Sequence, residues 1–266
     1  MTAWMARSLV VLGDSTAVGL GDPLPGGTWR GVGPLLADAL GARLTNLSFT
    51  GARVACVRKT QLPAALRVQP EAAVVIVGMN DTLRSDFDPD GMRADLGAAV
   101  AELRAAGAVV LLVRYHDHGR VFRLPRSLHR ALRARIDRLN AVIDAVVAEH
   151  GCGCVDLNRM PGAYEVSAWS VDRLHPSELG HRMLASEFSA QLLARGCVVP
   201  RPVSLECSGG LQPSAAQHVA WLLLKGIPWM WRRGRDLIPY ALAVMVRSVL
   251  TPEPVLDHPE PALEHP

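Results

Sequence analysis

The sequence predicts an α/β fold built on a doubly wound, parallel, five-stranded sheet. Two observations predict this class. Short β-branched runs alternate with longer stretches of helical period, and two of the runs, 73–77 and 109–113, are nearly continuous in Val, Ile and Leu. An unbroken apolar run is typical of a parallel strand that helices cover on both faces. Parallel neighbours also need crossover helices, so the alternation itself favours this class.

The expected strands are short apolar segments with few charged residues. They cover residues 8–12, 44–49, 73–77, 109–113 and 154–157.

The expected helices are stretches in which apolar residues recur at spacings of three and four. One covers 92–103, with Asp90 as its N-cap. A second covers 128–147, and a third begins at Pro176, a residue suited to the first turn, and runs to about residue 195.

Composition limits the class of protein. A hydrophobic content of 49% in 266 residues supports a substantial core. The net charge of +3 comes with scattered basic residues, which argues against nucleic acid as a partner. No stretch reaches the roughly 18–20 uninterrupted apolar residues that a spanning helix needs. Without a signal-peptide pattern, and with five cysteines in no disulfide pattern, we expect inert, buried thiols and a cytoplasmic location.

The character of the chain changes near residue 200, where Pro and Gly become frequent. We therefore expect four regions: a main domain over 1–199, a linker over 200–213, a helical extension over 214–250 and a disordered tail over 251–266.

Tryptophans and basic residues lie together in the expected extension. Trp221, Trp229 and Trp231 are interspersed with Lys and Arg. Three interpretations stay open: the extension packs on the main domain, for example as a lid; it makes a peripheral contact with the inner membrane surface; or it joins copies of the chain.

Candidate site residues follow the expected strands. Ser15, in Gly-Asp-Ser, follows the first strand, Gly51 the second and Asn80 the third, while Asp172 and His175 directly precede the last helix. Ligands of parallel sheets bind at the carboxyl ends of the strands. Each motif alone is ordinary turn composition, but their succession at strand ends predicts one site.

These motifs resemble those of the GDSL/SGNH hydrolase family, whose signature residues are Ser, Gly, Asn and His. Ser15 matches the nucleophile, Gly51 the second block, Asn80 the third, and Asp172 with His175 the Asp-x-x-His block. The resemblance covers about residues 8–195. It implies an SGNH-type domain with a flavodoxin-like, three-layer α/β/α fold, and hydrolysis of carboxylic esters or thioesters without a cofactor.

Physical chemistry gives these residue types roles in acyl transfer. A serine hydroxyl needs an adjacent base, which His175 can supply, and Asp172 can hold the imidazole in the required tautomer. The oxyanion needs hydrogen-bond donors, and we expect the backbone N–H groups of Ser15 and Gly51 and the amide of Asn80.

Two further aspartates, Asp14 and Asp81, neighbour these candidates. We expect them to support the site by hydrogen bonding to loop backbone rather than by transferring protons.

The segment after the fourth strand is expected to wall the substrate pocket. Tyr115, His116, Phe122 and Leu124 are the candidate pocket residues, the last two as contacts for an acyl chain. His116 and His118 supply too few ligands to predict a metal site.

The sequence therefore predicts a serine hydrolase that cleaves a small-molecule or lipid ester through an acyl-serine intermediate. A thioesterase or acyltransferase using the same site stays open, as does a ligand-binding or scaffold protein that retains the fold. A nucleotide-binding protein is disfavoured because the chain has neither Gly-x-Gly-x-x-Gly after the first strand nor a P-loop.

Overall fold

The computed structural model describes residues 3–122, 124 and 126–208. Within them, five parallel strands form one sheet in the order β2-β1-β3-β4-β5, which is the flavodoxin-like order. The predicted fold class is confirmed. The strands are β1 (Ser8–Gly13), β2 (Arg43–Asn46), β3 (Ala72–Ile76), β4 (Val109–Arg114) and β5 (Gly153–Asp156).

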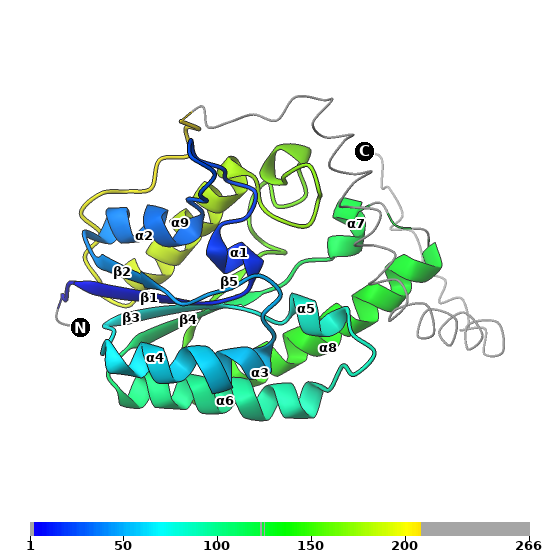
Figure 1. Cartoon of the computed structure of the whole chain (residues 1–266), viewed down its shortest axis with the longest axis horizontal. Helices are drawn as coiled ribbons and strands as arrows, with labels where there is room; N and C mark the ends of the chain where they lie inside the picture. Colours follow the sequence, from blue (N-terminus) through cyan, green and yellow to red (C-terminus); the bar gives the residue numbers. More distant parts are fainter. Residues whose placement is uncertain (1–2, 123, 125, 209–266) are drawn as a thin grey trace, which may run out of the picture.

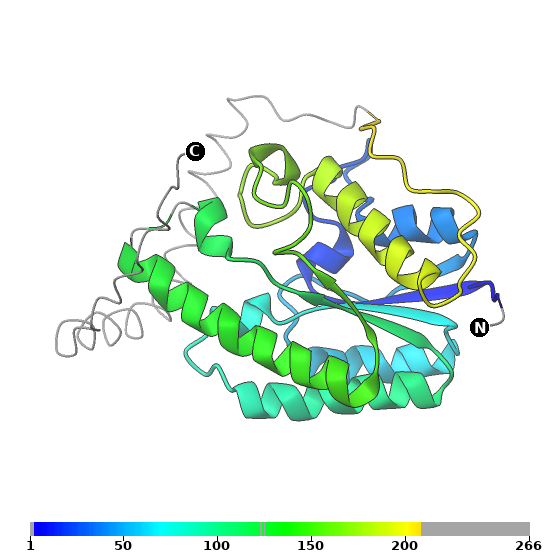
Figure 2. The ribbon, with the colours of Figure 1, turned by 180° about the vertical axis from the view of Figure 1, so that it is seen from behind.

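Helices cover both faces of the sheet, which gives three layers (Figures 1 and 2). One face carries α2 (Val32–Leu40) and α9 (Glu178–Leu193), and the other carries α4 (Leu62–Arg67), α6 (Pro89–Ala105) and α8 (Arg126–His150). All five residues of β3 are buried, as a strand covered on both faces requires. The shorter elements are α1 (Ser15–Val18), α3 (Val54–Cys56), the π-helical turn η1 (Val57–Gln61), α5 (Met79–Thr82), α7 (His118–Phe122) and the 3-10 turn η2 (Val166–Ala168).

Strand ends agree with the prediction to within one residue, except at the end of β2. The predicted strand continues to residue 49, whereas β2 ends at Asn46. The Asn46 side chain donates to the Ala17 carbonyl at 2.9 Å and accepts the Ser48 backbone N–H at 3.1 Å. The backbone still bonds to β1 beyond Asn46, since the Leu47 N–H donates to the Val11 carbonyl at 2.9 Å and the Phe49 N–H to the Gly13 carbonyl at 3.3 Å.

Two predicted helix starts were wrong. Asp88, not Asp90, caps α6, because its carboxylate accepts the Gly91 N–H at 3.1 Å. Ser177 caps α9 through the Gly180 N–H at 3.2 Å, so Pro176 precedes the helix instead of beginning it.

The chain after α9 returns along the helices of one face. Arg201 N–H donates to the Ala39 carbonyl at 3.1 Å, and Arg182 donates to the Ser204 carbonyl at 2.9 Å. The described part of the predicted linker, 200–208, is therefore bonded to α2 and α9. The rest of the linker, the extension 214–250 and the tail 251–266 lie outside the described residues.

The five cysteines are free thiols in different environments. Cys152 and Cys197 are buried and Cys56 and Cys154 half-buried, whereas Cys207 is exposed, which contradicts the expectation of buried thiols at that position. In the described ranges, no helix is both long and apolar enough to cross a bilayer.

Candidate active site

Most of the predicted site residues meet at the carboxyl edge of the sheet, where the strand order reverses. Ser15 follows β1 and Asn80 follows β3, and these two strands are neighbours in the sheet. Tyr115 and His116 follow β4, and Leu157 follows β5. Crevices at this reversal point are the usual ligand sites of open α/β sheets.

The turn that presents Ser15 depends on Gly13 and Gln61. Gly13 has a φ of +139°, and a Cβ there would lie 1.9 Å from the Ile76 carbonyl oxygen, so only glycine fits. Gln61, the last residue of η1, donates to the Gly13 carbonyl at 2.9 Å and accepts its N–H at 2.7 Å. Gln61 was not among the predicted site residues.

Asp14 also stabilises this turn. Its carboxylate accepts the Thr16 N–H at 3.0 Å and so caps α1. Burial raises the pKa of Asp14 to about 7, and the Thr16 bond offsets only part of that effect. Asp14 therefore lies beside Ser15 as a carboxyl group that titrates near neutrality.

Ser15, His175 and Asp172 form a continuous hydrogen-bonded chain. Ser15 Oγ lies 2.7 Å from His175 Nε2, and His175 Nδ1 lies 2.6 Å from Asp172 Oδ2. Ser15 and His175 are each 9% exposed, so both groups are shielded from solvent. This geometry allows the imidazole to take a proton from the serine hydroxyl while the carboxylate holds it in place.

The turn around Asp172 fixes the position of His175. Asp172 Oδ1 accepts the backbone N–H groups of Leu174 at 2.9 Å and His175 at 3.0 Å, and the Ser170 hydroxyl at 2.7 Å. Arg173 lies inside this turn with a φ of +56°, a left-handed conformation that is strained for a non-glycine residue.

These bonds decide the charge of Asp172. Burial alone would raise its pKa, but the hydrogen bond and charge of His175, together with Ser170, lower it to about 2. Asp172 is therefore ionised at neutral pH and can stabilise a positive charge on His175.

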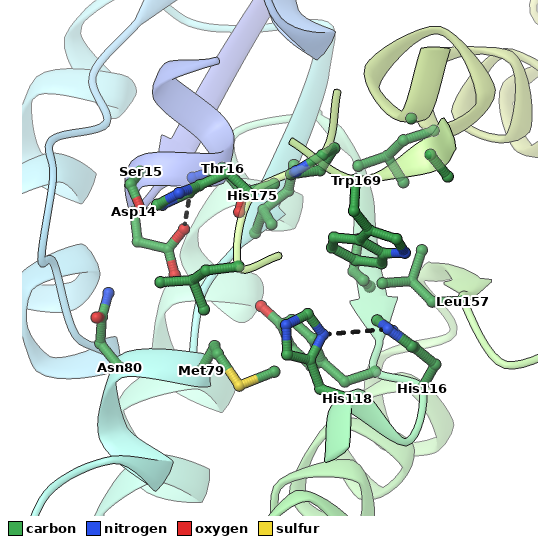
Figure 3. Close-up of a pocket in the computed structure, with 18 of the residues that line it drawn as sticks. Asp14, Ser15, Thr16, Met79, Asn80, His116, His118, Leu157, Trp169 and His175 are labelled. Atoms are coloured by element: carbon green, nitrogen blue, oxygen red, sulfur yellow. Dashed lines mark hydrogen bonds between the residues drawn. The ribbon is translucent and has the colours of Figure 1, made fainter. Parts of the chain in front are cut away.

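Gly51 and Asn80 lie on adjoining loops. The Asn80 side-chain amide donates to the Ala52 carbonyl at 3.1 Å and lines the pocket beside Ser15 (Figure 3). An amide has two N–H donors, so one stays available to a ligand. Gly51 has a φ of +82° with open space where a Cβ would lie, so its backbone conformation, not a close approach, requires glycine. Gly51 is not among the residues that line the pocket.

Asp81 connects the loop after β2 to α5. Its carboxylate accepts the Val54 N–H at 3.2 Å and pairs with Arg53 Nε at 3.1 Å. The pKa of Asp81 is raised because burial outweighs the hydrogen bond and charge of Arg53. Arg53 also binds Asp86 at 2.8 Å.

A pocket opens beside Ser15 with a cavity volume of about 50 Å³. Figure 3 shows Asp14, Ser15 and Asn80 on one side and Trp169, Leu157 and His116 on the other. Most of the wall is apolar, from side chains such as Leu83, Val113 and Met160.

Three polar residues after β4 also line the pocket: Tyr115, His116 and His118, which we name the β4 wall. His116 Nε2 and His118 Nδ1 are 3.1 Å apart, and burial lowers the pKa of His116 to about 4 and that of His118 to about 3. Both rings are therefore neutral at pH 7. His118 and Trp169 were not predicted as pocket residues.

Two predicted pocket residues lie elsewhere. Phe122 and Leu124 are partly buried against the hydrophobic core and do not line the pocket. The chain forms α7 from His118, the last residue of the β4 wall, to Phe122, and the rings of these two residues make a T-shaped contact with centroids 4.6 Å apart. Phe122 thus supports a pocket residue from behind, which corrects the prediction of a direct acyl contact.

Comparison with known proteins agrees with this site. The family model described as "GDSL-like Lipase/Acylhydrolase family" matches residues 11–183, a range that includes every predicted catalytic residue. The chain belongs to this family. The resemblance seen in the sequence is confirmed, and membership in the GDSL-like family supports hydrolase chemistry at the pocket.

Solved structures similar to this GDSL-like chain share its fold. LAE5, an α/β hydrolase from the metagenome of Lake Arreo in Spain, is 24% identical with a TM-score of 0.57, over 71% of this chain and 96% of LAE5. Axe2, an acetylxylan esterase from Geobacillus stearothermophilus, is 22% identical with a TM-score of 0.57, over 72% and 96%. TesA is 26% identical with a TM-score of 0.57, over 70% and 98%. No curated protein sequence matches the chain.

Proposed function

We propose that this protein hydrolyses carboxylic esters through an acyl-serine intermediate, with Ser15 as nucleophile, His175 as general base and Asp172 as its orienting carboxylate. The observation that carries the proposal is the unbroken chain from Ser15 Oγ through His175 to Asp172, with separations of 2.7 and 2.6 Å, at the edge of a pocket. A structural role alone does not require a buried serine hydroxyl aligned on an imidazole in this way.

The reaction follows from that alignment. As Ser15 Oγ attacks the ester carbonyl carbon, its proton passes to His175 Nε2, and the carbonyl π electrons move to the oxygen. The tetrahedral intermediate collapses with cleavage of the bond to the alcohol oxygen, and His175 returns the proton to that alcohol. Water then repeats both steps on the acyl-serine, which releases the acid and restores Ser15.

Three donors are proposed to bind the oxyanion: the backbone N–H groups of Ser15 and Gly51 and the Asn80 side-chain amide. Asn80 lines the pocket, and its bond to the Ala52 carbonyl links it to the loop that contains Gly51. Loss of one such donor typically lowers kcat about 10²–10³-fold. An Asn80→Ala variant is therefore expected to lose activity without losing Ser15 reactivity altogether.

Thioester cleavage or acyl transfer would begin with the same acyl-serine. The alternatives differ only in which molecule reaches that intermediate, so an oxygen ester is the simplest assignment. The acetylxylan esterase Axe2, which shares the fold, acts by its name on oxygen esters.

A p-nitrophenyl ester series from acetyl to a long acyl chain tests the proposal, together with a fluorophosphonate probe. Wild type is expected to turn over at least one ester and to be labelled by the probe, and Ser15→Ala is expected to do neither. Ser85→Ala, which changes an exposed serine, is the matched control and is expected to behave as wild type. An unlabelled, inactive wild type would contradict the proposal and favour a binding or scaffold role.

A further inference from the structure

Three buried polar atoms of the β4 wall have no hydrogen-bond partner among the described residues: the Tyr115 hydroxyl, His116 Nδ1 and His118 Nε2. The backbone of Arg173 acts on the His118 ring, so the Tyr115 hydroxyl and His116 Nδ1 are the two atoms left for a ligand. Tyr115 is 7% exposed and His116 is 1% exposed, and both line the pocket beside Ser15. The large majority of buried polar atoms in proteins are hydrogen-bonded, so each exception needs a physical explanation.

The backbone of Tyr115 is held on both of its polar groups. Asn140, a buried residue of α8, accepts the Tyr115 N–H at 2.8 Å and donates to its carbonyl at 2.8 Å. The backbone at the end of β4 is thereby fixed on both sides. Tyr115 lines the pocket, and burial, together with the charges of Asp14 and Asp81, raises the pKa of its hydroxyl well above the ordinary value.

His116 is held by its ring contacts. It stacks on Trp169 with centroids 4.9 Å apart and planes inclined by 28°, while its Nε2 faces His118 Nδ1. Trp169 is itself anchored by a bond from its indole N–H to the Ala163 carbonyl at 2.8 Å. The ring cannot rotate Nδ1 toward another partner without losing these contacts.

A plain alkyl chain in this pocket would leave both atoms without water and without a hydrogen-bond partner, which costs binding free energy. A ligand hydroxyl can both donate and accept a hydrogen bond. It can therefore donate to one of these two groups and accept from the other. The surrounding wall, which includes Leu83, Val113 and Leu157, suits the short carbon chain that would bear that hydroxyl.

We propose that the pocket binds the acyl part of the ester and selects short acyl groups that bear a hydroxyl, through the Tyr115 hydroxyl and His116 Nδ1. The inference rests on the proposed function. The acyl part is assigned to the pocket because it stays bound to Ser15 through both half-reactions, whereas the alcohol must leave before water attacks. Sites built to hydrogen-bond a substrate hydroxyl discriminate strongly against analogues that lack it.

Two esters of equal shape test the selection: the p-nitrophenyl esters of β-hydroxybutyrate and β-methylbutyrate, in which a methyl replaces the hydroxyl. Values of kcat/KM are divided by the rates of alkaline hydrolysis to remove intrinsic reactivity. Wild type is expected to prefer the hydroxy ester by about tenfold or more. In Tyr115→Phe the preference is expected to fall about fivefold or more, mainly because the methyl ester improves.

Tyr164→Phe is the matched control. The Tyr164 hydroxyl lies outside the pocket lining, donates to Asn158 at 2.6 Å and accepts the Asp117 N–H at 3.2 Å. Phenylalanine keeps the ring that contacts His116, so removal of this hydroxyl is expected to leave the preference unchanged. A wild-type preference within about twofold of unity would overturn the inference without any variant, and so would an unchanged preference in Tyr115→Phe. Failure of the proposed function looks different, because neither ester would then be turned over in a Ser15-dependent way.

Discussion

Both sides of the pocket are largely shielded from solvent, but they differ in how completely their polar groups are hydrogen-bonded. Around Ser15, His175 and Asp172, hydrogen bonds saturate the carboxylate: Asp172 accepts from the His175 ring, two backbone N–H groups and Ser170. On the β4 wall, the Tyr115 hydroxyl and His116 Nδ1 have no partner in the described structure. Burial therefore does not distinguish the two sides, whereas hydrogen bonding does. A polar group whose hydrogen bonds are all made inside the protein positions other residues, whereas a buried polar group without a partner suits a hydrogen bond to a ligand.

The same contrast appears in the charges. Asp172 is held ionised with a pKa of about 2, since His175 and Ser170 outweigh its burial. His116 and His118 are held neutral, because burial lowers their pKa values to about 4 and 3. One side is thus prepared to stabilise a developing positive charge, and the other presents neutral donors and acceptors.

Asp172→Asn changes the fully hydrogen-bonded side of the pocket, formed by Ser15, His175 and Asp172. It is expected to have the largest effect, a loss of about 10⁴-fold in kcat. Asparagine can keep the acceptor for the backbone N–H groups, but its amide would face His175 Nδ1 as a donor. The imidazole would then hold its proton on Nε2 and could not accept from Ser15. The measurement is kcat on the best p-nitrophenyl ester, with thermal unfolding as the check on folding. A loss below about tenfold would contradict the assigned role.

Asp14→Asn tests the buried carboxyl group next to Ser15. Its folded pKa of about 7 lies above the ordinary value of 3.8, so the folded state retains a proton that the unfolded chain releases. That stabilisation is complete below about pH 4 and is lost as the pH rises toward 7. Asparagine cannot ionise, and it keeps an acceptor for the Thr16 N–H.

The variant is therefore expected to match wild type at acid pH and to exceed its free energy of unfolding by about 2–4 kcal/mol at pH 8. Denaturant unfolding at about pH 4.5 and about pH 8 measures the difference. A difference that is the same at both pH values would show that Asp14 does not titrate in this window.

Asn140→Ala removes the support of the β4 wall. It leaves the buried N–H and carbonyl of Tyr115 without partners, and the expected cost is about 2–3 kcal/mol in the free energy of unfolding. Asn158→Ala, at an exposed position, is the control and is expected to cost less than about 1 kcal/mol. Equal losses in the two variants would mean that the wall is not held by Asn140.

Sequence patterns placed Ser15, Asn80, Asp172 and His175 correctly because their positions follow from nearby strands and turns. Ser15 and Asn80 directly follow parallel strands, and such positions lie at the carboxyl edge whatever the rest of the chain does. Asp172 and His175 lie three residues apart in one turn. Gln61 was missed because it reaches Gly13 from 48 positions away, through packing that no short motif records.

The β4 wall was predicted only in part. Tyr115 and His116 could be placed because they follow a strand, but apolar character cannot say whether a loop residue faces a pocket or the core. Phe122 and Leu124 were assigned to the pocket on that ground and lie against the core instead. The predicted second strand runs three residues past the end of β2, and in those residues Leu47 and Phe49 still donate to β1 carbonyls.

Tyr115→Phe tests the difference in hydrogen bonding between the two sides of the pocket, and its expected effect is the smallest. If the hydroxyl is unpaired in the free protein, its removal is expected to stabilise the fold by about 1 kcal/mol, because a buried polar group without a partner is lost. Tyr164→Phe deletes the same atom from a hydroxyl that donates to Asn158 and accepts the Asp117 N–H, and it is expected to destabilise by about 1 kcal/mol. Opposite signs in denaturant unfolding would show that the two hydroxyls differ in bonding. Destabilisation in both variants would mean that ordered water already satisfies Tyr115, and a ligand hydroxyl would then have to displace that water to bind.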